Sequence, residues 1–135
     1  MSSKIFYVVH IDDNSELLIF TEEIIDEIEG IEIAYTSFTN RGDFFEEEIE
    51  VPDLIITDLM LEPDKQIEEP AQTGIDFIQN IKSNETFKNT KIMVFSARSD
   101  DFLKKELSPY VVKYCTKDMT DSEFQQTIKA LLTGN

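Results

Sequence analysis

Short apolar runs that alternate with stretches of helical spacing are the feature that most restricts how this chain can fold. The runs are rich in Ile, Val, Tyr and Phe, and the stretches between them repeat apolar residues every three or four positions. Strict alternation of strands and helices is typical of a parallel sheet, because each helix returns the chain to the edge where the next strand begins. Since such crossovers are right-handed, the pattern predicts an α/β doubly wound sandwich with helices on both faces.

Five of the apolar runs are predicted to be strands of the sheet. The first, from Ile5 to Ile11, is apolar without a period of two, as is typical of a strand buried on both faces. The third ends at Asp58, after the sequence DLIIT. The other three begin near Ile31, Lys91 and Val111.

The intervening stretches predict five helices and one long loop. Residues 59–73 are predicted to form a surface loop, because they contain two prolines and several acids. Thr120 and Glu123 form a capping box that opens the last helix. The other helices are expected from about Leu17 to Gly30, from Phe44 to Ile49, from Gly74 to Ile81, and from Asp100 to Leu107 with Ser99 as the cap.

The length and the cysteine content indicate one cytoplasmic domain. The 135 residues are enough to bury a core, and no internal linker is visible, so residues 1–135 are expected to form a single domain. Cys115 is the only cysteine, which excludes an intramolecular disulfide and fits a reducing compartment. No stretch approaches the ~20 apolar residues of a membrane span, so no membrane attachment is expected.

The charge of the chain restricts its partners. There are 28 acidic and 12 basic residues, which gives a net charge of −16. This field repels phosphate backbones, so direct binding of nucleic acid is not expected. Divalent cations and proteins with basic patches are the favoured partners, although an acidic surface that serves only solubility is an equally open interpretation.

Polar residues follow several of the predicted strands. In an open parallel sheet, ligands bind beyond the carboxyl ends of the strands. Asp12 and Asp13 follow the first strand and Asp58 ends the third. If these strands are neighbours, three carboxylates converge and need a compensating cation. Because the ligands are all oxygens, the sequence predicts an Mg²⁺ site there.

The same sheet edge has the groups needed to capture a phosphoryl group. Asp58 can act as a nucleophile toward phosphorus, forming an acyl phosphate whose charge must be neutralised. Mg²⁺ serves one side of that group, and Lys117, after the fifth strand, serves the other. Ser96, at the end of the fourth strand, supplies a hydroxyl that can donate to a phosphoryl oxygen.

These residues resemble the receiver domains of two-component response regulators, the CheY-like family. The likeness spans nearly the whole chain and rests on Asp12 and Asp13 in HIDDN, Asp58 in IITDLM, Ser96 in VFSA and Lys117 in YCTK. It implies a flavodoxin-like sheet of order 2-1-3-4-5. It further implies that a histidine kinase or a histidine phosphotransfer protein phosphorylates Asp58, and that the chain is a signalling domain that catalyses only its own phosphotransfer and dephosphorylation.

The resemblance also implies roles for two further residues. The backbone carbonyl of Met60 would complete the metal site, and Tyr114 would swing inward together with Ser96 on phosphorylation. The face formed by the fourth helix, the fifth strand and the fifth helix would then act on a downstream protein partner. Formation of a homodimer through that face is left open.

The sequence departs from the family pattern in two places. Asp118 follows Lys117 where the family usually has a proline with a cis peptide bond, so a trans bond is expected here. From Asp58 to Gly74 there are 74 − 58 = 16 positions, about twice the family spacing, which indicates an acidic insertion. The insertion, near Asp64 to Ala71, either biases the choice of partner or is a passive surface loop.

Other interpretations of the same residues remain. Asp12 and Asp13 could serve merely as helix caps instead of metal ligands. His10 and Cys115 are interpreted as packed core residues without a role. A phosphatase of the haloacid-dehalogenase type needs an acid two residues past its nucleophile, where this chain has Met60. A receiver-like module that binds without phosphorylation and a flavodoxin-type flavin carrier are the other rivals. The flavin carrier is disfavoured because the acidic pair would repel the flavin phosphate.

Overall fold

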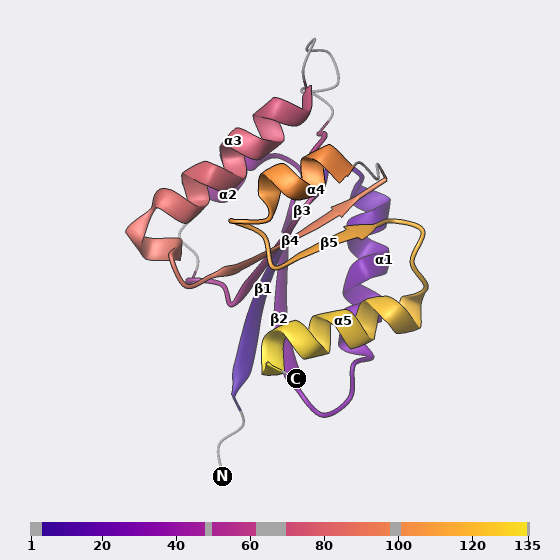
Figure 1. Ribbon diagram of the computed structural model, residues 1–135. Coiled ribbons are helices and arrows are strands. Elements are labelled where there is room, and N and C mark those ends of the chain that lie inside the picture. The colour runs from indigo at the N-terminus through magenta and orange to yellow at the C-terminus, as the bar shows by residue number, and fades with distance from the viewer. Residues whose placement is uncertain (1–3, 48–49, 62–69, 98–100, 135) are drawn as a thin grey trace.

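A five-stranded parallel sheet forms the centre of the molecule (Figure 1). The computed structural model describes residues 4–47, 50–61, 70–97 and 101–134. The strand order is β2-β1-β3-β4-β5, and each pair of neighbours is parallel. The predicted doubly wound α/β class and its strand order are confirmed. The strands are β1 (Ile5–Ile11), β2 (Glu32–Phe38), β3 (Leu54–Thr57), β4 (Lys91–Ser96) and β5 (Lys113–Thr116).

Helices cover both faces of the sheet, and the two halves of the core show which helices lie on which face (Figure 1). One half joins side chains of α2, α3 and α4 to the sheet, and the other joins those of α1 and α5. All residues of β3 are buried, as expected of a central strand covered on both sides. The helices are α1 (Ser15–Asp26), α2 (Arg41–Glu46), α3 (Pro70–Ser83), the short 3₁₀ helix η2 (Glu85–Phe87), α4 (Asp101–Leu107) and α5 (Asp121–Thr133).

Two of the helix boundaries follow the capping residues rather than the apolar spacing. The short acidic helix was expected from Phe44, but α2 begins at Arg41 because the side chain of Asn40 accepts a hydrogen bond from Asp43 N at 2.8 Å. The first helix was expected to reach Gly30, but α1 ends at Asp26, and Gly30 lies in the following turn with φ of +90°. Both expected boundaries were therefore wrong by about one helical turn.

The third helix begins earlier than expected and shortens the predicted loop. Pro70 is the first residue of α3, a position where proline is favoured because the missing N–H has no helical partner. Residues 70–73, predicted to belong to the loop, are therefore helical. The core of the acidic insertion, residues 62–69, and the expected cap Ser99 lie outside the described residues.

The last helix and the turn before it agree with the sequence. Thr120 is confirmed as the N-cap, since its Oγ1 accepts a hydrogen bond from Glu123 N at 3.1 Å, and Glu123 Oε1 contacts the Thr120 hydroxyl at 3.0 Å. The bond between Lys117 and Asp118 is trans, as predicted, since no described residue has a cis peptide bond.

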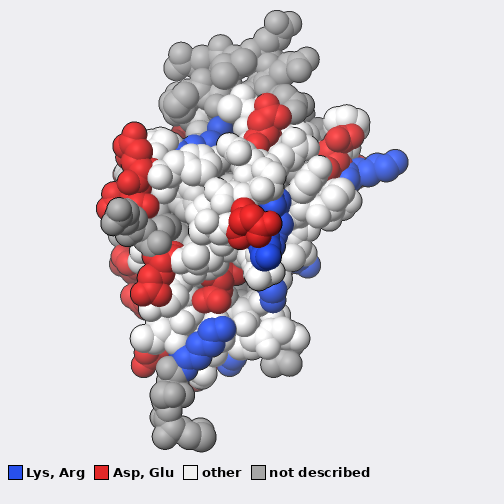
Figure 2. Space-filling model, turned by 90° about the vertical axis from the view of Figure 1, so that its left-hand side faces the viewer, with Lys and Arg blue, Asp and Glu red and all other residues white. Residues whose placement is uncertain are grey.

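On the face shown in Figure 2, acidic side chains gather along the left-hand margin, whereas Lys and Arg side chains lie mostly toward the centre and the right. This distribution agrees with the net charge of −16. Among the residues described here, no helix combines the length and the apolar character needed to cross a membrane.

Candidate functional site

Three carboxylates converge at the carboxyl ends of β1 and β3. Ile11 pairs with Thr57 across these strands, so the next residues, Asp12 and Asp58, are neighbours. One oxygen from each of Asp12, Asp13 and Asp58 can be chosen so that all lie within 4.8 Å of one another. Asp12 and Asp58 are buried and Asp13 is half-buried. The convergence predicted from the sequence is therefore present.

Lys117 reaches into this cluster from the end of β5. Its Nζ lies 2.7 Å from Asp12 Oδ2 and 2.8 Å from Asp58 Oδ2. The backbone N–H of Lys117 donates to the carbonyl of Ser96 at 2.9 Å, which continues the β4–β5 pairing and fixes where the side chain starts. One ammonium thus contacts two of the three carboxylates.

Burial and charge act in opposite directions on these groups. Burial raises the pKa of Asp12, although the Lys117 ammonium and the backbone N–H of Asn14, 2.9 Å from Asp12 Oδ1, partly offset this effect. Burial alone would lower the pKa of Lys117, but the hydrogen bonds and charges of Asp12 and Asp58 outweigh it, so the pKa of Lys117 is raised. Lys117 is therefore charged at neutral pH and holds a cluster that carries excess negative charge.

The donor set fits a hard divalent cation. All the converging side-chain atoms are carboxylate oxygens, and their separation allows them to bind one ion together. Asp13 is turned partly toward solvent, so water can complete the coordination. These are the preferences of Mg²⁺ more than of Zn²⁺, which favours nitrogen and sulfur ligands.

Both oxygens of the Asp58 carboxylate are held by the protein. Oδ2 contacts Lys117, and Oδ1 accepts a hydrogen bond from the backbone N–H of Met60 at 3.1 Å. The structure therefore places Met60 beside the predicted acceptor through its N–H. Its role as a carbonyl ligand stays a prediction.

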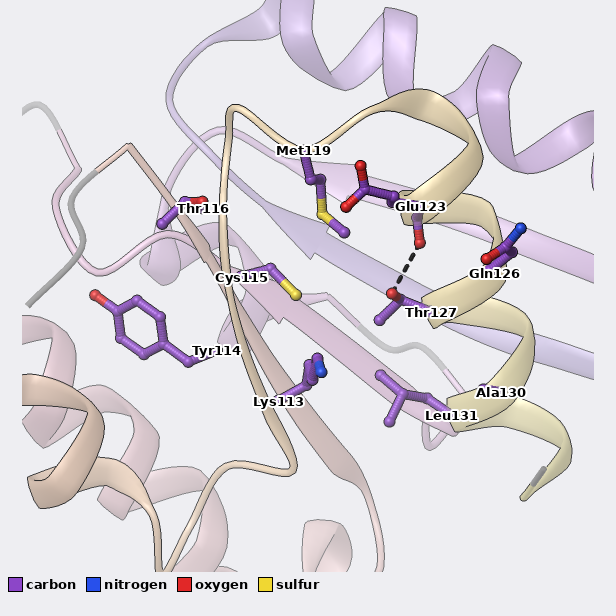
Figure 3. A pocket seen from close by; sticks show the side chains of 10 residues that line it. All are labelled: Lys113, Tyr114, Cys115, Thr116, Met119, Glu123, Gln126, Thr127, Ala130 and Leu131. Carbon is purple, nitrogen blue, oxygen red and sulfur yellow. Dashed lines mark hydrogen bonds between the residues drawn. The ribbon is translucent and has the colours of Figure 1, made fainter. Parts of the chain in front are cut away.

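The other two predicted site residues lie on β4 and β5. Ser96 is buried at the end of β4, where it pairs with Thr116. Tyr114 is half-buried and packs against the half of the core that contains α3 and α4, with the Lys104 ammonium 5.7 Å from its ring centroid. In Figure 3, Tyr114 points away from α5, whereas Cys115 points toward it. The ring thus lies on the face of the sheet that α4 covers.

Two residues that the sequence interpretation did not assign lie against the loop after Asp58. Arg41 Nη2 donates to the carbonyl of Leu59 at 3.0 Å. Gly74 of α3 packs so tightly on the same residue that a Cβ there would lie 2.4 Å from Leu59 O. The glycine was visible in the sequence as the end of the insertion, but nothing in the sequence indicated the contact of Arg41.

His10 and Cys115 are core residues, as interpreted from the sequence. His10 is fully buried, with Nδ1 2.8 Å from the hydroxyl of Tyr35, and burial lowers its pKa to about 3. Cys115 is buried in β5, and burial raises the pKa of its thiol. A neutral imidazole and a protonated thiol are inert packing groups here.

Comparison with known structures identifies the fold. A signal receiver domain of a histidine kinase from Clostridium thermocellum matches 94% of this chain and 97% of its own with a TM-score of 0.76 at 18% identity. A BeF3-activated DrrB receiver domain matches 96% of this chain and 99% of its own, with a TM-score of 0.75 at 19% identity.

The chain has the fold of a receiver domain.

Sequence comparison adds a relative but no matching family. Hybrid signal transduction histidine kinase D of Dictyostelium discoideum is 26% identical over 127 residues, which are 93% of this chain. The chain spans only 8% of the length of that relative. No model of a protein family matches the sequence. The predicted resemblance to receiver domains is confirmed by the fold.

Proposed function

We propose that this receiver domain accepts a phosphoryl group on Asp58, with Mg²⁺ bound by Asp12, Asp13, Asp58 and the carbonyl of Met60. The observation that carries the proposal is that Lys117 and three carboxylates meet at one sheet edge, with Lys117 2.8 Å from the acceptor. A buried site that combines a nucleophile, a cation and a metal-binding acidic cluster suits phosphoryl capture. The Dictyostelium histidine kinase relative agrees with a role in two-component signalling.

The transfer itself requires little chemistry from the protein. A lone pair of the Asp58 carboxylate forms the new bond to phosphorus, and the bond from phosphorus to the donor breaks with its electron pair left on the donor. Bound Mg²⁺ would neutralise the negative charge that builds up on the phosphoryl oxygens. Lys117 supplies a second positive charge at Asp58 Oδ2, and Ser96 supplies a hydroxyl donor at the neighbouring strand end.

The same contacts would carry the signal to a partner. Phosphoryl oxygens that draw in Ser96 and Lys117 give the phosphorylated state contacts that the free state lacks, and only such differential contacts can shift a conformational equilibrium. Tyr114 lies on β5 two residues before Thr116, the partner of Ser96, and packs against the half of the core that contains α4, so its ring would move into the space that Ser96 leaves. The face formed by α4, β5 and α5 would then bind a downstream protein, and a histidine kinase or histidine phosphotransfer protein would be the donor.

The first test is the intact mass of the chain after incubation with acetyl phosphate, with and without Mg²⁺. One phosphoryl adduct is expected, only when Mg²⁺ is present. Asp58→Asn should remove it, because an amide is a poor nucleophile, whereas Glu106→Gln, an exposed acid of α4, should keep it. A folded native chain that takes no phosphoryl group from acetyl phosphate or phosphoramidate would refute the proposal and favour a module that binds without phosphorylation.

A further inference from the structure

The peptide unit between Leu59 and Met60 lies between a guanidinium group and the proposed acceptor. At one end of this unit, the carbonyl of Leu59 accepts a hydrogen bond from Arg41 Nη2 at 3.0 Å. At the other end, the N–H of Met60 donates to Asp58 Oδ1 at 3.1 Å. Because the unit is planar, a force that fixes the carbonyl also fixes the direction of the N–H.

Arg41 is held in place by its surroundings. It is the first residue of α2, directly after the Asn40 cap. Its guanidinium carbon lies 5.3 Å from the centroid of the Phe77 ring, a distance at which a cation is attracted to an aromatic face. Phe77 belongs to α3, is 6% exposed, and packs edge to face with Phe44 at 6.1 Å. The cation therefore rests on a rigid aromatic cluster rather than in open solvent.

The surroundings of the Leu59 carbonyl hinder another hydrogen-bond donor from replacing Arg41. Gly74 lies against the same carbonyl, close enough that a Cβ would be 2.4 Å from the oxygen. Leu59 itself is 1% exposed, so solvent does not replace a lost donor easily. In such a buried place, a charged donor on the carbonyl polarises the peptide and strengthens the N–H at its other end.

We propose that Arg41 is a positioning residue for the phosphoryl acceptor. It fixes the 59–60 peptide so that Met60 N–H holds Asp58 Oδ1, which keeps Oδ2 turned toward Lys117. The role rests on the proposed function, since it matters only if Asp58 accepts a phosphoryl group. The sequence alone does not suggest it, because Arg41 is 17 positions from Asp58 in the sequence (58 − 41) and belongs to another element.

The test compares Arg41→Gln and Arg41→Lys with a control, Lys88→Gln, which removes an exposed cation that forms an ion pair with the exposed Glu85. The first readout is the amide proton shift of Met60 in a ¹⁵N-labelled chain without metal. This shift should move upfield in Arg41→Gln as the hydrogen bond to Asp58 weakens. The second is the rate of phosphorylation by acetyl phosphate at saturating Mg²⁺, which should fall roughly tenfold, as expected for one lost charge-assisted hydrogen bond. Arg41→Lys should recover part of both, and Lys88→Gln should match the native chain.

The outcomes separate this inference from the proposed function. A native chain that is never phosphorylated overturns the proposed function. A native chain that is phosphorylated, with Arg41→Gln equal to it in both readouts, overturns the role of Arg41. Should Arg41→Gln fail to fold, Phe77→Leu takes its place, since it removes the ring under the guanidinium but keeps an apolar side chain, and the same two readouts decide.

Discussion

Replacing Gly74 of α3 with alanine has two effects on the stability of the fold, and they are opposite in sign. In an exposed helix, replacing glycine with alanine stabilises the protein by about 1 kcal/mol, because alanine loses less backbone entropy on folding. Gly74 is buried against the loop after Asp58, and its new Cβ would lie 2.4 Å from Leu59 O and 2.9 Å from Leu59 Cα. Both neighbours are backbone atoms, so neither can rotate away.

The structure gives the size of the conflict. To reach an ordinary contact of 3.4 Å from the present 2.4 Å, α3 and the loop must separate by about 1 Å. Overpacking of this kind costs about 1–3 kcal/mol, and the rigid neighbours favour the upper end. After the gain in helix propensity, we expect Gly74→Ala to lower the free energy of unfolding by about 2 kcal/mol. With a urea dependence of roughly 1.5 kcal/mol per molar, the midpoint falls by roughly 1 M.

Urea unfolding followed by circular dichroism measures this change, and Gly42→Ala is the matched control. Gly42 lies exposed in α2, where the nearest atom to a new Cβ is Asn40 Oδ1 at 3.4 Å, so alanine should stabilise by up to ~1 kcal/mol. The two variants make the same chemical change with opposite expected signs. If Gly74→Ala is as stable as Gly42→Ala, the close approach of α3 to Leu59 is wrong.

Two further predictions concern buried charges. Because the pKa of His10 is lowered from 6.5 to about 3, the folded state binds a proton at His10 more weakly than the unfolded state does. The contribution of His10 to the free energy of unfolding is therefore full above pH 6.5 and is lost as the pH falls toward 3, by roughly 4 kcal/mol. His10 is the only histidine, so urea midpoints should fall more between pH 7 and 5 in the native chain than in His10→Gln, and equal falls would contradict the assignment. Lys117→Ala leaves two buried carboxylates without their cation, so it should cost roughly 3 kcal/mol without Mg²⁺. Added Mg²⁺ should recover more stability in this variant than in the native chain, and an unchanged midpoint on adding Mg²⁺ would count against a shared cation site.

The strands and the acidic cluster could be predicted from sequence for a common physical reason. A central strand such as β3 must be apolar on both faces, so it appears as a short apolar run that ends where a polar group meets the sheet edge. Asp12 and Asp58 are the residues that follow such runs, and parallel pairing brings them together. Knowledge of the strand ends was therefore nearly enough to place the site.

The helix boundaries and the supports of the site were harder to predict. α2 and α3 begin at Arg41 and Pro70 because of local capping and backbone effects, which apolar spacing does not report. The contacts of Arg41 and Gly74 with Leu59 depend on how α2 and α3 pack over a loop, which is decided by tertiary structure. A residue that acts through another residue's backbone has no signature in the sequence.

The wide sequence separation of the residues that meet at Asp58 has a consequence for folding kinetics. The contact from Lys117 to Asp12 spans 117 − 12 = 105 positions, and the contact from Lys117 to Asp58 spans 59. Contacts between residues far apart in the sequence have the largest entropic cost of loop closure, so they form late, after the strands between them have paired. We therefore expect a refolding chain to acquire its helices well before it can accept a phosphoryl group.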